Sequence, residues 1–190
     1  MKRDLFMVID MQNVYAEGGE WFCPSIDIAT NNIISVLQEA KENNAIDVIF
    51  TKFIASKSPV GTWVTYNEDY KSVNTNEYAN EMIDGLKPYA TDYEVYEKSE
   101  YSSLSVQDIR NLVSSYIEDG RVVVSGVVAE CCVLATVMEL IDMGVKVVYL
   151  TDAVAGIDDS TQQAVLKILE GLDPLHVRRM TTEEYLNENR

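Results

Sequence analysis

The sequence is poor in cysteine and has no long hydrophobic run. It contains three cysteines, two of them adjacent, which are too few for a disulfide framework and indicate a reducing, cytoplasmic setting. The apolar run Leu5–Ile9 stops at Asp10, so it is too short for the core of a signal peptide or for a membrane span, which needs roughly 18 apolar residues. The sequence therefore predicts neither a leader nor a transmembrane segment.

Basic residues are scarce relative to acidic ones. The chain has 15 Lys and Arg residues against 31 Asp and Glu residues, and its formal net charge is −16. A surface this acidic repels phosphate backbones and anionic lipids, which argues against nucleic acid and membrane partners. The 47% hydrophobic and 24% charged residues are typical of a soluble globular protein, and the length of 190 residues predicts a single domain over residues 1–190.

Short apolar runs rich in β-branched residues alternate with longer amphipathic segments. Strands are predicted at Leu5–Ile9, Asp47–Thr51, Tyr93–Tyr96, Val122–Ser125, Lys146–Leu150 and His176–Arg178. Helices are predicted at Ile26–Asn43, Ser105–Ile117 and Cys131–Met143, the last being apolar on nearly all sides and therefore mostly buried. This alternation predicts a doubly wound α/β fold, with a mainly parallel six-stranded sheet and helices on both faces.

One stretch, Lys52–Asn80, shows little helical or strand periodicity. It is long for a connection, and such loops are often lids or binding walls. It carries Trp63 and Tyr66, and Tyr101 follows shortly after Lys98. We expect these three rings either to contact a substrate or to pack against the core or a second subunit.

Polar residues at strand ends are candidates for function, because ligands of such sheets bind at the carboxyl ends of the strands. Asp10 ends the first predicted strand, where desolvation would raise its pKa toward that of a useful base. The same aspartate could instead cap the following loop. Lys98 follows the third predicted strand, although most lysines are simply solvated surface residues.

Cys131 and Cys132 lie just beyond the fourth predicted strand, at the start of a helix. The positive end of the helix dipole would lower the pKa of a thiol there, and neighbouring backbone N–H groups can bind an oxyanion. Successive helical residues point about 100° apart, so only one of the two thiols can face a pocket. Free cysteines are usually buried small hydrophobes, and Cys23 beside Trp21 is expected to be packing or pocket wall.

Together these motifs resemble the isochorismatase-like cysteine hydrolases, which include nicotinamidases and N-carbamoylsarcosine amidohydrolases. The resemblance covers nearly the whole chain. Its motifs, in order, are strand-end Asp10, the Lys98-Ser99 pair, Gly126-Val127-Val128-Ala129-Glu130-Cys131-Cys132-Val133 and Leu150-Thr151-Asp152-Ala153.

The resemblance implies a Rossmann-like three-layer fold in which Asp10, Lys98 and Cys132 form the catalytic group. It also implies a cis peptide bond at Val127–Val128 and an oxyanion hole made by the backbone N–H groups of Val128 and Cys132. Members of this family are commonly oligomers, so we expect a homo-oligomer, either a dimer or a tetramer.

Two departures from the family pattern bear on the substrate. Ala129 stands where many amidases of the family have threonine. Nicotinamidases carry an Asp-x-His-x-x-x-His metal motif after the second strand, whereas this chain reads Thr51-Lys52-Phe53-Ile54-Ala55-Ser56-Lys57-Ser58 there, and its only histidine is His176. We therefore expect no metal, no other cofactor and a substrate other than nicotinamide.

The resemblance thus predicts an enzyme that hydrolyses a C–N bond of a small amide, carbamoyl or ureide substrate through a thioester on Cys132. Two alternatives stay open. Isochorismatases share the fold but hydrolyse a vinyl ether by protonation from the strand-end aspartate, without a cysteine nucleophile. A non-enzymatic, redox-responsive protein would use Cys131 and Cys132, whose disulfide is strained and easily reduced, but it leaves Asp10 and Lys98 without a role.

Overall fold

A six-stranded sheet forms the centre of the molecule. The structure, a computed structural model, describes residues 3–189, so residues 1, 2 and 190 of the expected domain lie outside it. All strand pairs are parallel, in the order β3-β2-β1-β4-β5-β6. The strands are β1 (Asp4–Ile9), β2 (Ile46–Phe53), β3 (Glu94–Lys98), β4 (Arg121–Val127), β5 (Val147–Ala155) and β6 (Val177–Met180). The predicted α/β class and all six predicted strands are confirmed.

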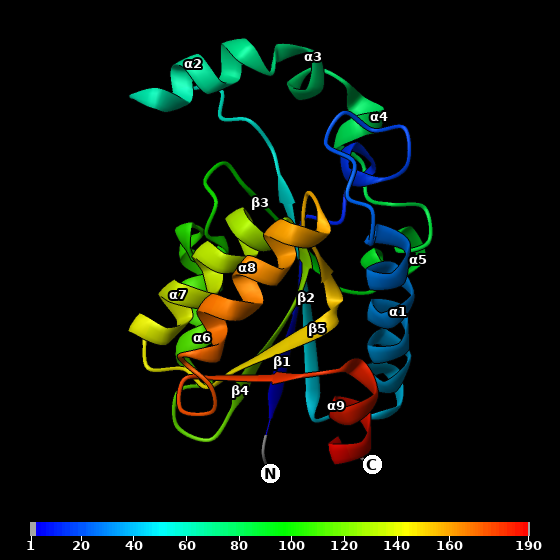
Figure 1. Cartoon of the computed structure of the whole chain (residues 1–190), viewed down its shortest axis with the longest axis vertical. Helices are drawn as coiled ribbons and strands as arrows, with labels where there is room; N and C mark the ends of the chain where they lie inside the picture. The colour runs from blue at the N-terminus through cyan, green and yellow to red at the C-terminus, as the bar shows by residue number, and fades with distance from the viewer. Residues whose placement is uncertain (1–2, 190) are drawn as a thin grey trace.

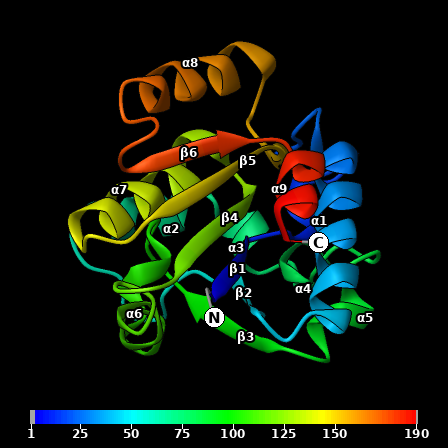
Figure 2. The same cartoon turned by 90° about the horizontal axis from the view of Figure 1, so that it is seen from below.

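Helices cover both faces of this sheet (Figures 1 and 2). On one face lie α1 (Ile26–Glu42), α5 (Lys87–Ala90) and α9 (Thr182–Asn189), and on the other lie α6 (Gln107–Ser114), α7 (Leu134–Asp142) and α8 (Asp159–Glu170). The sequence analysis did not predict α8, of which only Val165 and Leu169 are buried. No helix of the described chain has the length and apolar character needed to cross a bilayer.

The central strand β1 contributes to both halves of the core. Phe6 and Val8 pack with the α1 side, while Leu5, Met7 and Ile9 pack with the α6, α7 and α8 side, and all five are fully buried. Side chains alternate across a strand, so a strand covered on both faces must be apolar at every position. This explains why the first strand reads as one unbroken hydrophobic run.

The order of the strands creates a switch point between β1 and β4, since the chain builds β2 and β3 on one side of β1 and β4, β5 and β6 on the other. Ligands of open α/β sheets bind at such a point, beyond the carboxyl ends of the strands. The two strands approach closely there. Gly126 pairs with Ile9 and has a φ of 110°, and a Cβ on Gly126 would lie 2.1 Å from the Ile9 carbonyl oxygen.

The stretch Lys52–Asn80 is more regular than the sequence predicts. It first extends β2 to Phe53 and then forms the short helices α2 (Thr62–Asp69), α3 (Lys71–Asn74) and α4 (Glu77–Asn80). Figure 1 shows these helices beyond the carboxyl end of β2, apart from the helices that cover the sheet. Of their side chains only Val73 is buried, so the sequence carries no apolar stripe that would reveal them.

Candidate active site

The first polar side chain at the switch point belongs to Asp10, which directly follows β1. It is fully buried, and its backbone has a φ of 52°. The Asp10 N–H donates to the Thr51 carbonyl oxygen at 3.1 Å, and Thr51 Oγ1 donates to Asp10 Oδ1 at 2.7 Å. The hydroxyl occupies one carboxylate oxygen and leaves Oδ2 for another partner.

That partner is Lys98, the last residue of β3. Its Nζ lies 2.6 Å from Asp10 Oδ2, and neither side chain is exposed to solvent. Nζ also donates to the Glu100 carbonyl oxygen at 3.1 Å. Burial acts to lower the pKa of Lys98, but its interactions with the Asp10 carboxylate, and with Cys132 when that thiol is ionised, outweigh burial and raise it. The structure therefore holds a buried ammonium–carboxylate pair, which is stable only because each charge has its partner.

Cys132 lies in a π-helical turn, Ala129–Val133, between β4 and α7. The Val128 carbonyl oxygen accepts from the N–H groups of Cys131 at 3.1 Å and Val133 at 3.3 Å. Turns of this wide type recur at functional sites. The sequence predicted an ordinary helix from Cys131 onward, and the extra residue in the turn is not visible in its apolar pattern.

The thiol of Cys132 interacts with both members of the buried pair. Burial raises the pKa of the Cys132 thiol well above its ordinary value, and Asp10 raises it further. Lys98 lowers this pKa, but by less than burial and Asp10 together raise it. The expected lowering of this pKa by the helix dipole is therefore wrong in its net direction, because the site is dry and the nearest carboxylate is negative. At neutral pH the resting site contains a thiol beside a carboxylate that can accept its proton.

Alkylation measures this protonation state directly. In a Cys23→Ser, Cys131→Ala background, we expect iodoacetamide to modify Cys132 slowly at pH 7 and about tenfold faster for each pH unit above that, because only the thiolate reacts. Adding Asp10→Asn should raise the rate at pH 7, since the carboxylate that raises the thiol pKa is removed while Lys98 remains. A rate independent of pH from 6 to 9, followed by mass spectrometry, would instead reveal a resting thiolate.

Cys132 opens into a hollow of about 220 Å³ that we call the aromatic pocket. Its lining residues are Tyr15, Trp21, Phe53, Tyr66, Tyr70, Tyr101, Val128, Glu130, Cys131, Cys132 and Ile157. Two of the three candidate substrate contacts, Tyr66 and Tyr101, are among them. Trp63 is not, because it packs behind them, with ring centroids 5.1 Å from both Tyr66 and Tyr101.

Several lining residues are absent from the sequence-based set. Tyr15, in the short helix η1 (Asn13–Tyr15), is buried, and its pKa is raised by burial and then by Cys132 and Asp10. Trp21 follows in the same loop after β1, and Tyr70 comes from the α2–α3 junction. Tyr15 lies close to the end of β1, which is its signal in the sequence, whereas Trp21 and Tyr70 lie further from any strand end. Cys23 is buried in the core and does not line the aromatic pocket. Burial, and to a smaller extent the charge of Glu130, raise the pKa of its thiol to about 12.

The peptide bond between Val127 and Val128 is cis. It lies where the family pattern implied such a bond, at the end of β4 and just before the turn that carries Cys132. Val128 lines the aromatic pocket, and Cys132 does as well. The two residues expected to supply oxyanion N–H groups thus border the same small space.

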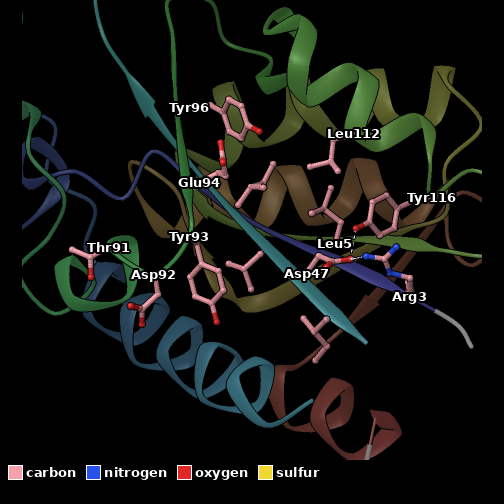
Figure 3. Close-up of a pocket in the computed structure, with 13 residues that line it drawn as sticks. Arg3, Leu5, Asp47, Thr91, Asp92, Tyr93, Glu94, Tyr96, Leu112 and Tyr116 are labelled. Carbon is pink, nitrogen blue, oxygen red and sulfur yellow. Dashed lines mark hydrogen bonds and ion pairs between the residues drawn. The ribbon is translucent and has the colours of Figure 1, made fainter. Parts of the chain in front are cut away.

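A larger hollow of about 750 Å³ lies away from this chemistry (Figure 3). It is lined mainly by residues at the edge formed by β2, β3 and α6, including Arg3, Asp47 and Tyr116. The Asp47 carboxylate accepts hydrogen bonds from both Arg3 and Tyr116. The lining of this hollow does not include Asp10, Lys98 or Cys132, so the hollow is separate from the candidate active site.

The residues after β2 do not fit the metal motif of nicotinamidases. The chain continues there with Ile54, Ala55 and Ser56, whose side chains do not include an imidazole or a carboxylate. Within residues 3–189, no three His, Cys, Asp or Glu side chains are grouped as a metal site requires. We assign no metal to this site.

Comparison with solved structures identifies proteins that share this fold. Three solved structures superpose over most of the chain. A cysteine hydrolase from Pseudomonas syringae pv. phaseolicola has a TM-score of 0.81 and 23% identity, covering 97% of this chain and 91% of that one. An isochorismatase-like hydrolase from Alkaliphilus metalliredigens has a TM-score of 0.77 and 18% identity, covering 98% of each. A pyrazinamidase of Pyrococcus horikoshii in complex with zinc has a TM-score of 0.74 and 20% identity, covering 94% and 99%.

At these identities the solved structures establish the fold alone. The assignment to a family comes from comparison of the sequence with family models. A search of curated proteins gives no match. The family model described as the isochorismatase domain matches residues 4–184. The chain therefore belongs to the isochorismatase family of hydrolases.

Proposed function

We propose that this chain is an amidohydrolase that cleaves a C–N bond of a small amide, carbamoyl or ureide compound, with Cys132 as the nucleophile. The observation that supports it best is the contact of the Cys132 thiol with a fully buried Asp10–Lys98 pair. A nucleophile, a proton acceptor and a fixed positive charge are the parts that covalent amide hydrolysis needs.

The first half of the reaction transfers the acyl group to sulfur. Asp10 accepts the proton of Cys132 as Sγ attacks the carbonyl carbon, and the carbonyl oxygen becomes an oxyanion. The backbone N–H groups of Val128 and Cys132 stabilise this oxyanion. The C–N bond then breaks as Asp10 returns the proton to the leaving nitrogen, which releases ammonia or an amine and leaves a thioester.

The second half releases the acid. Asp10 accepts a proton from water, whose oxygen attacks the thioester carbonyl carbon, and the C–S bond breaks. The proton returns from Asp10 to Cys132, and the net reaction is amide plus water to acid plus ammonia or amine. Lys98 remains protonated throughout and stabilises each negatively charged state through its field.

A substrate panel tests this proposal. We expect at least one primary amide, carbamoyl compound or ureide to release ammonia, with an acyl adduct on Cys132 visible by intact-mass measurement after rapid quenching. Isochorismate belongs in the same panel, because hydrolysis of its vinyl ether by a Cys132→Ala variant would support the alternative reaction of the family. Absence of Cys132-dependent turnover or adduct across amides and imides would rule out the amidohydrolase.

A further inference from the structure

The walls of the aromatic pocket form a nearly continuous belt of rings. Tyr15 contacts Trp21 at 5.8 Å between ring centroids, Trp21 contacts Tyr70 at 5.3 Å, and Tyr70 contacts Tyr66 at 4.8 Å. Phe53 continues the belt, 6.0 Å from Tyr66. Burial raises the pKa values of Tyr15 and Tyr66, so both rings are neutral and present π faces or hydroxyl donors.

The charge of this pocket is negative. Its lining includes no Lys, Arg or His side chain, and its one carboxylate belongs to Glu130. Lys98 does not line the pocket, and its charge is already paired with Asp10. An anionic substrate group would therefore have no cation to bind among these residues, and burying it beside Glu130 would cost free energy.

The Glu130 carboxylate is held in place but not neutralised. Oε1 accepts the Ile157 N–H at 3.3 Å. Oε2 is buried and has no hydrogen-bond partner within the described part of the chain, and no ion pair to Glu130 is found there. Because Oε2 has almost no accessible surface, a ligand in the pocket does not touch it, and the charge of Glu130 acts on the pocket through its field.

We infer that the substrate carries a cationic group, such as a quaternary or primary ammonium, beside its scissile amide, and that Glu130 determines this specificity. This inference rests on the proposed amidohydrolase function. Aromatic faces attract ammonium groups through their quadrupole, and Glu130 adds an opposite charge at the wall. The net charge of −16 further favours the approach of cations. The volume of about 220 Å³ suits a small molecule, since drug-sized ligands occupy roughly 300–1,000 Å³.

A matched pair of probes separates charge from shape. Betaine amide, (CH₃)₃N⁺–CH₂–CONH₂, and its neutral isostere 3,3-dimethylbutanamide differ only in the central nitrogen or carbon. Their binding to the Cys132→Ala chain is measured by calorimetry, because turnover would also reflect the electron-withdrawing effect of the ammonium group on the carbonyl. We expect the Kd of betaine amide to be at least about tenfold lower than that of the isostere.

Variants of Glu130 then test whether its charge causes the preference for betaine amide over the neutral isostere. Glu130→Gln keeps the size and the acceptor for the Ile157 N–H, and it should reduce the preference to less than about threefold. Glu118→Gln removes the same charge from an exposed position between α6 and β4, at the amino end of the sheet, and should leave the preference intact. Equal Kd values for the two probes, absence of betaine amide binding at millimolar concentration, or an unchanged preference in Glu130→Gln would each overturn the inference.

The two proposals fail in different ways. If the wild-type chain hydrolyses neutral amides through Cys132 but the two probes bind with equal Kd, the proposed amidohydrolase function is supported and the proposed cationic substrate is rejected. If betaine amide binds selectively but no amide yields Cys132-dependent turnover, the pocket is a cation-binding site and the proposed amide hydrolysis is rejected.

Discussion

Replacing Cys132 by alanine is expected to lower kcat/KM for any amide substrate by at least about 10⁴-fold while leaving the fold intact. The Cys132 thiol both contacts the Asp10–Lys98 pair and lines the aromatic pocket, so its loss removes the proposed covalent route. Ammonia release measured at substrate concentrations far below KM gives the ratio, and circular dichroism verifies folding.

The neighbouring cysteine supplies the matched control. Cys131 also lines the aromatic pocket, but burial and the charge of Glu130 raise its pKa, and no ionic pair is beside it. We expect Cys131→Ala to change kcat/KM by no more than about tenfold, the lower end of what one missing group in an apolar pocket costs. If Cys131→Ala lowers kcat/KM more than Cys132→Ala does, Cys131 is the nucleophile and the proposed mechanism is contradicted.

Breaking the buried pair should affect stability as well as reaction rate. We expect Lys98→Met to lower the free energy of unfolding by about 3–5 kcal/mol, because the Asp10 carboxylate is then buried without its counter-charge. Asp10→Asn should act similarly by leaving the ammonium unpaired. Urea unfolding followed by circular dichroism measures both values.

The double variant Asp10→Asn, Lys98→Met distinguishes a charge effect from lost packing. Because neither buried charge remains, it should be more stable than either single variant. Lys167→Met removes a lysine of an exposed ion pair, with side chains 80% and 51% exposed, and should leave the free energy of unfolding almost unchanged. If the double variant loses the sum of the single effects, the pair contributes through shape and not through charge.

The sheet and the position of Asp10 at a strand end could be predicted from the sequence because both follow strong local rules. Leu5–Ile9 must be apolar throughout to be buried on two faces, and Asp10 interrupts it at the point where the strand ends. Lys98 and Cys132 were found through their order along the chain and their resemblance to a family. Their mutual contacts were not derivable, since they depend on strand order and on how far each side chain reaches.

The pocket walls were harder to predict because no periodic pattern marks them. Tyr15 and Trp21 belong to a loop, and Tyr70 lies between two short helices that bury almost nothing. Trp63 and Tyr66 are three residues apart on α2, yet only Tyr66 lines the pocket. Which ring of a short, exposed helix turns inward is decided by tertiary packing, for which local sequence carries little information.

The close approach of Gly126 to Ile9 belongs to the sheet, whereas much of the pocket wall does not. Backbone contact between β1 and β4 brings the strand end that carries Asp10 next to the strand end that precedes the Cys132 turn. Four of the surrounding rings, by contrast, come from η1, α2 and the connections beside them. Exchanging those outer segments would change the shape of the pocket without changing the contact between β1 and β4. Glu130, in contrast, belongs to the turn that carries Cys132, so its charge stays with that turn.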